Sequence, residues 1–121
     1  MSTPIGPYSP LVRLGELLVT SGQLGVVPGD GGAPRLVEGG TGAQLAQALA
    51  NGLALLETEG ARRDDIAKAT VYVLDMAEFP LVNEVWLDFF GDHRPARTAI
   101  GVASLPMGAA VEVELWAASS R

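Results

Sequence analysis

The segment from 41 to 60 constrains the fold of this chain more than any other. Leucines recur along it at helical spacing, at Leu45, Leu49, Leu53 and Leu56. Thr41 and Gln44 have the spacing of a capping box, and Gly60 is a typical C-terminal stop. The pattern predicts a helix over about 42–59 whose apolar side is buried against a sheet. We therefore expect Leu53→Asp to be severely destabilising, because it places an unpaired charge on that side.

A second apolar stripe at helical spacing follows downstream. Its members are Phe79, Val82, Val85, Trp86, Phe89 and Phe90. Asp75 and Glu78 have the spacing of a helix start, and Gly91 predicts the end of this second helix. Because Trp86 falls within the stripe, its position favours packing in the core.

Five other stretches have the composition of β-strands. They are 11–14, 17–21, 66–74, 96–102 and 111–117. The first two are predicted to form a hairpin that turns at Gly15, whereas the proline-rich residues 1–10 predict an extended loop. The order β-β-α-β-α-β-β has no repeat and no linker. It predicts a single α+β domain over residues 1–121, with a mixed sheet and both helices packed on one face.

The inventory of reactive side chains excludes several classes of site. The chain has no cysteine, one histidine and one lysine. It therefore has no disulfide, thiolate nucleophile or cysteine-bound zinc, and it lacks the histidine pair of common metal motifs. His93 lies between Gly91 and Pro95 in a predicted surface turn, which favours a structural role over membership of a catalytic triad. We expect neither a metal nor a cofactor.

Charge and hydropathy limit the possible partners. The net charge of −6 argues against binding to a nucleic-acid backbone, and the densest basic pair, Arg62 and Arg63, is followed at once by two aspartates. We find no apolar run of transmembrane length and no export leader, so we expect a soluble, cytoplasmic protein. Charged residues make up only 18% of the chain, against roughly 25% in typical soluble domains. We therefore expect partner subunits to cover part of an apolar surface.

Charged residues on predicted strands are the best candidates for chemistry. Arg97 lies near the start of one strand, and Glu112 and Glu114 share one face of the next strand. Since these strands are consecutive, we expect them to be neighbours in the sheet. One interpretation is structural, either an ion pair or a solvated sheet face. The other is an anion clamp, formed by the arginine, beside a carboxylate base.

Six short motifs carry a resemblance to a known family. They are Ile-Gly-Pro-Tyr-Ser at 5–9, Val-Thr-Ser-Gly-Gln at 19–23, Val-Asn-Glu-Val at 82–85, Pro-Ala-Arg-Thr at 95–98, Leu-Pro at 105–106 and Val-Glu-Val-Glu at 111–114. In order and separation they resemble the Rid (RidA/YjgF) family of reactive-intermediate deaminases. The resemblance implies a chorismate-mutase-like α+β fold assembled as a homotrimer, with a site in each cleft between subunits.

The resemblance also implies an activity, namely hydrolysis of 2-imino or enamine acids, such as 2-iminopropanoate and 2-iminobutanoate, to 2-oxo acids and ammonia. By resemblance, Arg97 holds the substrate carboxylate and Glu112 positions or activates the attacking water. The positions that resemble the pocket lining of the family are Tyr8, Ser21, Gly22, Asn83 and the backbone of Ala99. The implied partners are a small 2-imino or 2-oxo acid and two further copies of the chain, with no nucleic acid and no membrane.

The chain departs from the family pattern at several points. It starts only a few residues before Ile5, so we expect the short first strand common in the family to be absent or reduced. Ala99 takes a place often held by cysteine, and Thr98 and Trp86 also replace commoner residues. Two other functions remain open at this stage: a non-catalytic trimer that binds small carboxylates or regulates a partner, and a different hydrolytic activity.

Overall fold

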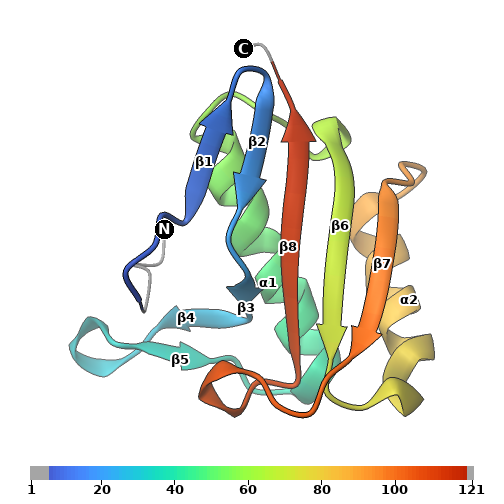
Figure 1. Ribbon diagram of the computed structural model, residues 1–121. Helices are drawn as coiled ribbons and strands as arrows, with labels where there is room; N and C mark the ends of the chain where they lie inside the picture. The colour runs from blue at the N-terminus through green and yellow to red at the C-terminus, as the bar shows by residue number, and fades with distance from the viewer. Residues whose placement is uncertain (1–5, 120–121) are drawn as a thin grey trace.

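A mixed β-sheet forms one layer of the structure, and two helices cover one of its faces (Figure 1). The computed structural model describes residues 6–119. Residues 1–5, which are the first half of the loop predicted for 1–10 and include Ile5 of the first motif, lie outside the described residues. The architecture is that of a single α+β domain, as the element order predicts.

The main sheet runs in the order β1-β2-β8-β6-β7, and the short strand β3 also pairs with β8. Only β6 and β7 are parallel; the other pairs are antiparallel. The strands of this sheet are β1 (Leu11–Leu14), β2 (Leu17–Thr20), β3 (Gln23–Leu24), β6 (Ile66–Val73), β7 (Ala96–Gly101) and β8 (Val111–Ala118). A separate hairpin consists of β4 (Val26–Pro28) and β5 (Pro34–Leu36), and the helices are α1 (Gly40–Glu57) and α2 (Phe79–Phe90).

The five predicted strands and the first helix are confirmed to within about two residues at their ends. The second helix is confirmed at its end, but it begins at Phe79, because the predicted start at Asp75 caps a separate short turn over Met76–Glu78. The elements that the sequence did not predict are β3, β4 and β5, which have only two or three residues each. Such short strands lie among glycines and prolines, and they give no measurable periodicity.

The expectation that β7 and β8 are neighbours is wrong, because β6 lies between them. After β6 the chain runs back over one face of the sheet as α2, and β7 then pairs parallel to β6 on the side away from β8. Parallel strands need such a crossover connection. The last strand, β8, then fills the position between β2 and β6 and is antiparallel to both. β7 is therefore left at the edge of the sheet.

The core lies between the helices and one face of the sheet. From α1, Leu45, Leu49 and Leu56 are fully buried, which confirms the leucine stripe. Leu53 is only half-buried and lines an open surface concavity with Arg62, Arg63, Asp64 and Asp65. A severe effect of Leu53→Asp is therefore no longer expected, because a charge at Leu53 can reach water. A charge at a fully buried position of α1, such as Leu49, cannot.

The predicted capping box at the start of α1 does not form. The N-cap residue is Gly39, in a left-handed conformation with φ of 114°, and no side chain caps the helix. Thr41 Oγ1 instead donates a hydrogen bond to Glu78 Oε1 at 2.9 Å, and Gln44 Oε1 accepts one from the Ala110 N–H at 2.9 Å. These two side chains tie α1 to the turn before α2 and to the start of β8.

The ends of both helices follow the glycine signals. α1 ends at Glu57, two residues earlier than predicted, and Gly60 adopts the positive φ of 83° that a C-terminal stop requires. α2 ends at Phe90 before Gly91. Asp75 caps a short turn that leads into α2 by accepting a hydrogen bond from the Ala77 N–H. His93 is half-buried with Nε2 2.7 Å from the Ile66 carbonyl oxygen, in keeping with a structural role.

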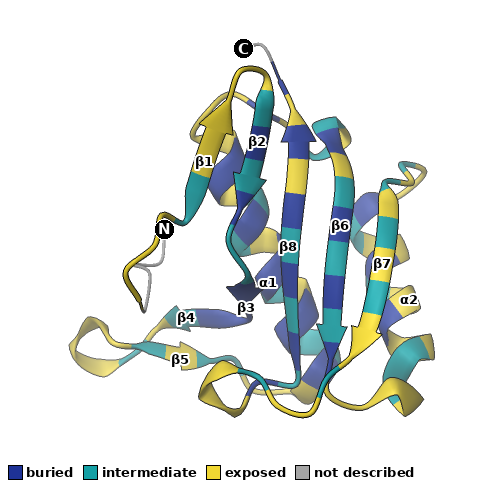
Figure 2. Ribbon diagram, viewed as in Figure 1, coloured by how far each residue is buried: buried dark blue, intermediate teal, exposed yellow. Residues whose placement is uncertain are grey.

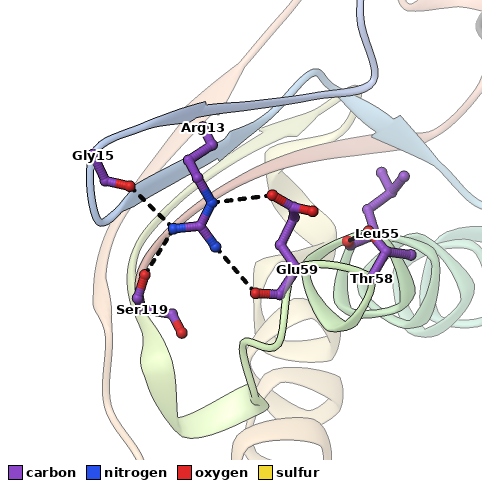
Figure 3. A network of polar contacts seen from close by, with 6 residues as sticks. All are labelled: Arg13, Gly15, Leu55, Thr58, Glu59 and Ser119. Carbon is purple, nitrogen blue, oxygen red and sulfur yellow. Dashed lines mark hydrogen bonds and ion pairs between the residues drawn. The ribbon is translucent and has the colours of Figure 1, made fainter. Parts of the chain in front are cut away.

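A network around Arg13 joins three parts of the chain that are distant in sequence (Figure 3). The guanidinium donates to Glu59 Oε1 and to the Glu59 carbonyl after α1, both at 3.0 Å. It also donates to the carbonyls of Gly15, in the β1–β2 turn, at 3.0 Å and of Ser119, after β8, at 2.9 Å. These bonds fasten the first hairpin and the end of β8 to the helix layer.

Candidate active site

The candidate site residues are divided between the two faces of the sheet. Alternate residues of each strand point to opposite faces, and pairing puts matching positions of neighbouring strands on one face. Arg97 pairs with the buried Ala69 and so lies on the face that the helices cover. Glu112 pairs with Tyr72 on the opposite face, which no helix or strand of residues 6–119 covers (Figure 2). We call these the covered face and the open face.

On the covered face, two aromatic rings of α2 flank the half-buried Arg97. The guanidinium carbon lies 5.1 Å from the centroid of the Phe79 ring and 5.2 Å from that of Trp86. Burial lowers the pKa of Arg97, because it disfavours the charged form. No other residue of 6–119 forms a hydrogen bond or ion pair with the Arg97 side chain. Its N–H donors therefore have no acceptor among the described residues.

Two further candidate positions lie on the same side of the molecule as Arg97. Asn83 is exposed on α2, four residues after Phe79 and three before Trp86, so it lies at the edge of the stripe that carries both rings. Ala99 is the next residue of β7 on the covered face and packs against the core. Since β7 is an edge strand, its outer backbone groups have no ladder partner within residues 6–119.

On the open face, Glu112 belongs to a small acidic cluster. Burial, and after it the charge of Glu114, raises the pKa of Glu112. Tyr72 on β6 donates its hydroxyl to Glu114 Oε1 at 2.8 Å, and this bond is the main cause that raises the pKa of Tyr72. Sequence reasoning missed Tyr72. The alternation of β6 carries the only signal, because it puts Tyr72 on the face opposite to the buried Val71 and Val73.

Gly22 lies directly against the Glu112 carboxylate. A Cβ atom on Gly22 would be 2.7 Å from Glu112 Oε2, so only glycine allows the carboxylate to stay where it is. The neighbouring Ser21 donates from Oγ to the Ser9 carbonyl oxygen at 2.6 Å and from its N–H to the Pro10 carbonyl oxygen at 2.9 Å. These bonds hold the N-terminal loop, with the exposed Tyr8, beside the end of β2.

The structure therefore forms two groups rather than one site. The first contains Arg97, Asn83 and Ala99, and the second contains Glu112, Gly22, Ser21 and Tyr8. Arg97 is on β7, two strands away from β8, so its backbone is about 10 Å from that of Glu112 across the sheet. It is also three residues out of register with Glu112, which adds about 10 Å along the strands. The two side chains point to opposite faces. The structural ion pair considered for Arg97 and the glutamates does not form within this chain.

Comparison with known proteins decides the family. The family model described as endoribonuclease L-PSP, which represents RidA/YjgF proteins, matches residues 1–119. The chain belongs to this family. A RutC family protein of Pyrococcus horikoshii is 40% identical over 92% of this chain and 86% of its own length.

Two other relatives carry functional information in their names. The 2-iminobutanoate/2-iminopropanoate deaminase of Bos taurus is 41% identical over 91% of this chain and 78% of its own length. The crystal structure of Escherichia coli TdcF with bound serine superposes with a TM-score of 0.86 at 35% identity, covering 97% of this chain and 91% of that one. The resemblance drawn from the six motifs is therefore confirmed at the level of the family.

Two features of residues 6–119 concern metal ions and membranes. The described residues contain no cluster of three or more histidine, aspartate or glutamate side chains arranged to hold a metal ion. Neither described helix has the length and hydropathy to cross a membrane.

Proposed function

We propose that this RidA/YjgF family member is a hydrolytic deaminase that converts small 2-imino or enamine acids, such as 2-iminopropanoate and 2-iminobutanoate, into 2-oxo acids and ammonia. The observation that carries the proposal is the half-buried Arg97 guanidinium, which lies between two aromatic rings without an acidic partner among residues 6–119. A guanidinium without an acidic partner can bind a substrate carboxylate through two parallel hydrogen bonds.

Glu112 is the proposed base. Its raised pKa suits a group that takes a proton from water near neutral pH. The water oxygen attacks the imine carbon, the electron pair of the C=N bond moves to nitrogen, and Glu112 accepts the proton that the water loses. The nitrogen takes that proton back from Glu112, which gives the neutral carbinolamine. Glu112 then carries the hydroxyl proton to the amino group, so that ammonia leaves as the C=O bond forms. The imine supplies its own electrophile, so none of these steps requires a metal or a cofactor.

The division of the candidate residues between two faces implies that two copies of the chain build each site. One copy supplies the Arg97 group, and a neighbouring copy supplies the Glu112 group with Tyr8, Ser21 and Gly22. We infer a homotrimer with three such sites, which agrees with the family expectation and with the apolar side chains on the open face. These include Val12, Leu14, Ile100 and Trp116, each between 42% and 75% exposed in the single chain.

Mixing two inactive variants tests both the reaction and the shared site. Arg97→Ala and Glu112→Gln are each expected to lower kcat/KM about a hundredfold or more for freshly generated 2-iminobutanoate. When the two variants are unfolded, mixed in equal amounts and refolded, about a quarter of the sites regain both residues if neighbouring copies supply them. The expected result is the reappearance of activity in the mixture, measured as release of 2-oxobutanoate.

Matched controls separate the site from the general effects of substitution. Arg35→Ala and Glu84→Gln remove the same charges from exposed positions outside both groups and are expected to retain activity. An unaltered chain that is no faster than Arg97→Ala contradicts the deaminase proposal. Inactive mixtures of otherwise folded variants contradict the two-copy site.

The second candidate is a trimer that binds small carboxylates without turnover. The Arg97 group favours this function, since a guanidinium between two rings can bind an anion without Glu112. The Pyrococcus horikoshii relative, in addition, bears no deaminase name. This function predicts saturable binding of 2-oxobutanoate, retained in Glu112→Gln, with no product from the imine. The kinetic assay above distinguishes the two.

The description of the matched family model as an endoribonuclease receives less support from this chain. The net charge of −6 disfavours a phosphate backbone, and the single histidine lies with Nε2 2.7 Å from the Ile66 carbonyl oxygen rather than in either group of candidate residues.

A further inference from the structure

We propose that the rings of Phe79 and Trp86 on α2 position the Arg97 guanidinium for the substrate carboxylate. We call these two rings the aromatic cradle. Both are then positioning residues, because they contact Arg97 and act through it. This inference rests on the proposed function, since it concerns the arginine of the same site.

The geometry of the cradle explains how a cation is held without being neutralised. Both ring centroids lie within the roughly 6 Å over which an aromatic face attracts a cation. A guanidinium is planar, and its N–H donors point outward in that plane while its faces stack on rings. Aromatic contacts therefore orient the group and leave its donors free. An acidic partner at the same place would occupy the donors and would have to be displaced by each substrate.

The cradle is also rigid. Trp86 is only 5% exposed, and its ring packs against the fully buried Phe90 with centroids 4.9 Å apart. Phe79 lies seven residues earlier on α2, two helical turns away, so both rings project from one side of the helix. The Asp75-capped turn fixes the start of α2 next to Phe79. Arg97 is thus held against a helix whose own position is set by the core.

The cradle predicts a specific kinetic effect. The carboxylate is present both in the bound substrate and in the transition state, so the contact with Arg97 contributes equally to both. Loss of the cradle is then expected to raise KM and leave kcat nearly unchanged. Substitution of a residue that only stabilises the fold would lower the melting temperature without raising KM selectively over kcat.

Phe79→Leu tests the proposal, and Phe89→Leu is its matched control. Phe89 is half-buried on the same helix and packs edge-on against Phe90 with centroids 4.8 Å apart, whereas the rings that lie over the Arg97 guanidinium within residues 6–119 are those of Phe79 and Trp86. Phe79→Leu is expected to raise KM about threefold or more with kcat within about twofold, while Phe89→Leu leaves both within about twofold. Phe79→Tyr keeps the aromatic face and is expected to restore KM. The inhibition constant of butanoate, a simple carboxylate, is expected to rise by the same factor as KM.

The outcomes separate the cradle from the proposed function. Equal KM values for the two leucine variants, with an active unaltered chain, overturn the cradle and leave the proposed function standing. A fall in kcat with unchanged KM for Phe79→Leu also overturns the cradle. If the unaltered chain neither hydrolyses 2-iminobutanoate nor binds butanoate, the proposed function and the role of the cradle are both overturned. Thermal unfolding of each variant shows whether the compared proteins are folded.

Discussion

The two faces of the sheet come from the same strands but differ in chemistry. Along β8, Val111, Val113 and Leu115 are fully buried on the covered face, whereas Glu112 and Glu114 alternate with them on the open face. The covered face is completed within one chain by α1 and α2. The open face carries half-buried carboxylates beside exposed apolar side chains. This contrast indicates that the fold is finished on the covered face, and it leaves the open face as the one on which the proposed neighbouring copies would pack.

Arg97 is the informative departure from this division. It is a basic side chain on the covered face, at the edge strand, where aromatic rings rather than a carboxylate hold it. The carboxylates that sequence reasoning set beside it are on the other face. The predictions that follow test how far the two faces act separately.

The largest effect is expected from a charge on the covered face. Leu115→Asp puts a carboxylate at a fully buried position, where the leucine packs tightly against Gly52 of α1. The free energy of unfolding is expected to fall by about 4 kcal/mol or more, a large part of the roughly 5–15 kcal/mol that is typical of a folded domain. Urea unfolding followed by circular dichroism measures it. A midpoint equal to that of the unaltered chain would show that the two faces have been misassigned.

The adjacent residue on the open face is expected to behave differently. Trp116→Asp changes a side chain that is 44% exposed, so the chain keeps its secondary structure, but the proposed trimer dissociates. Light scattering measures the mass. Leu81→Asp is the matched control, because Leu81 is 37% exposed on α2 and lies beside Gly42 of α1, away from the open face, so the mass is expected to remain that of the trimer. Dissociation by Leu81→Asp alone would place the contact on the helix layer instead.

A smaller effect is expected from Gly22→Ala, which tests the position of Glu112. The new Cβ would meet Oε2 at 2.7 Å, so the flexible carboxylate moves rather than the backbone. We expect kcat to fall about ten- to hundredfold with little change in melting temperature. Gly42→Ala on α1 is the control, because its Cβ makes only an ordinary contact of 3.4 Å with Leu81. An unchanged kcat for Gly22→Ala argues against Glu112 as the base.

The smallest effect concerns the pH dependence of stability. Because the pKa of Glu112 is raised in the folded state, the folded protein binds more protons than the unfolded chain between the ordinary and the raised pKa. Stability therefore falls as pH rises through that interval. Glu112→Gln removes this penalty, so it is expected to raise the melting temperature at neutral pH and to make no difference below the ordinary glutamate pKa of 4.5. If Glu112→Gln raises the melting temperature equally at acidic and neutral pH, the effect comes from packing and not from the ionisation of Glu112.

Local patterns in the sequence predicted most of the elements. The leucine stripe of α1, the aromatic stripe of α2 and the alternation of β8 identify these elements, because their periods reflect which side is buried. Glycines marked both helix ends, since only a positive φ completes such a stop. The same local view failed for the α1 capping box, where Thr41 and Gln44 bond to distant partners. It also missed β3, β4 and β5, which are too short to show a period.

The sequence by itself determined the longer elements with their buried sides, the family, and most of the residues worth testing. Tertiary structure alone decided that β6 separates β7 from β8, that Arg97 and Glu112 lie on opposite faces, and that Phe79 and Trp86 hold the arginine. The reason is physical. Burial of a side chain depends on the repeat of its own helix or strand, which short stretches of sequence contain. Strand order and contacts between elements depend on how the whole chain closes its core, and no local pattern records that.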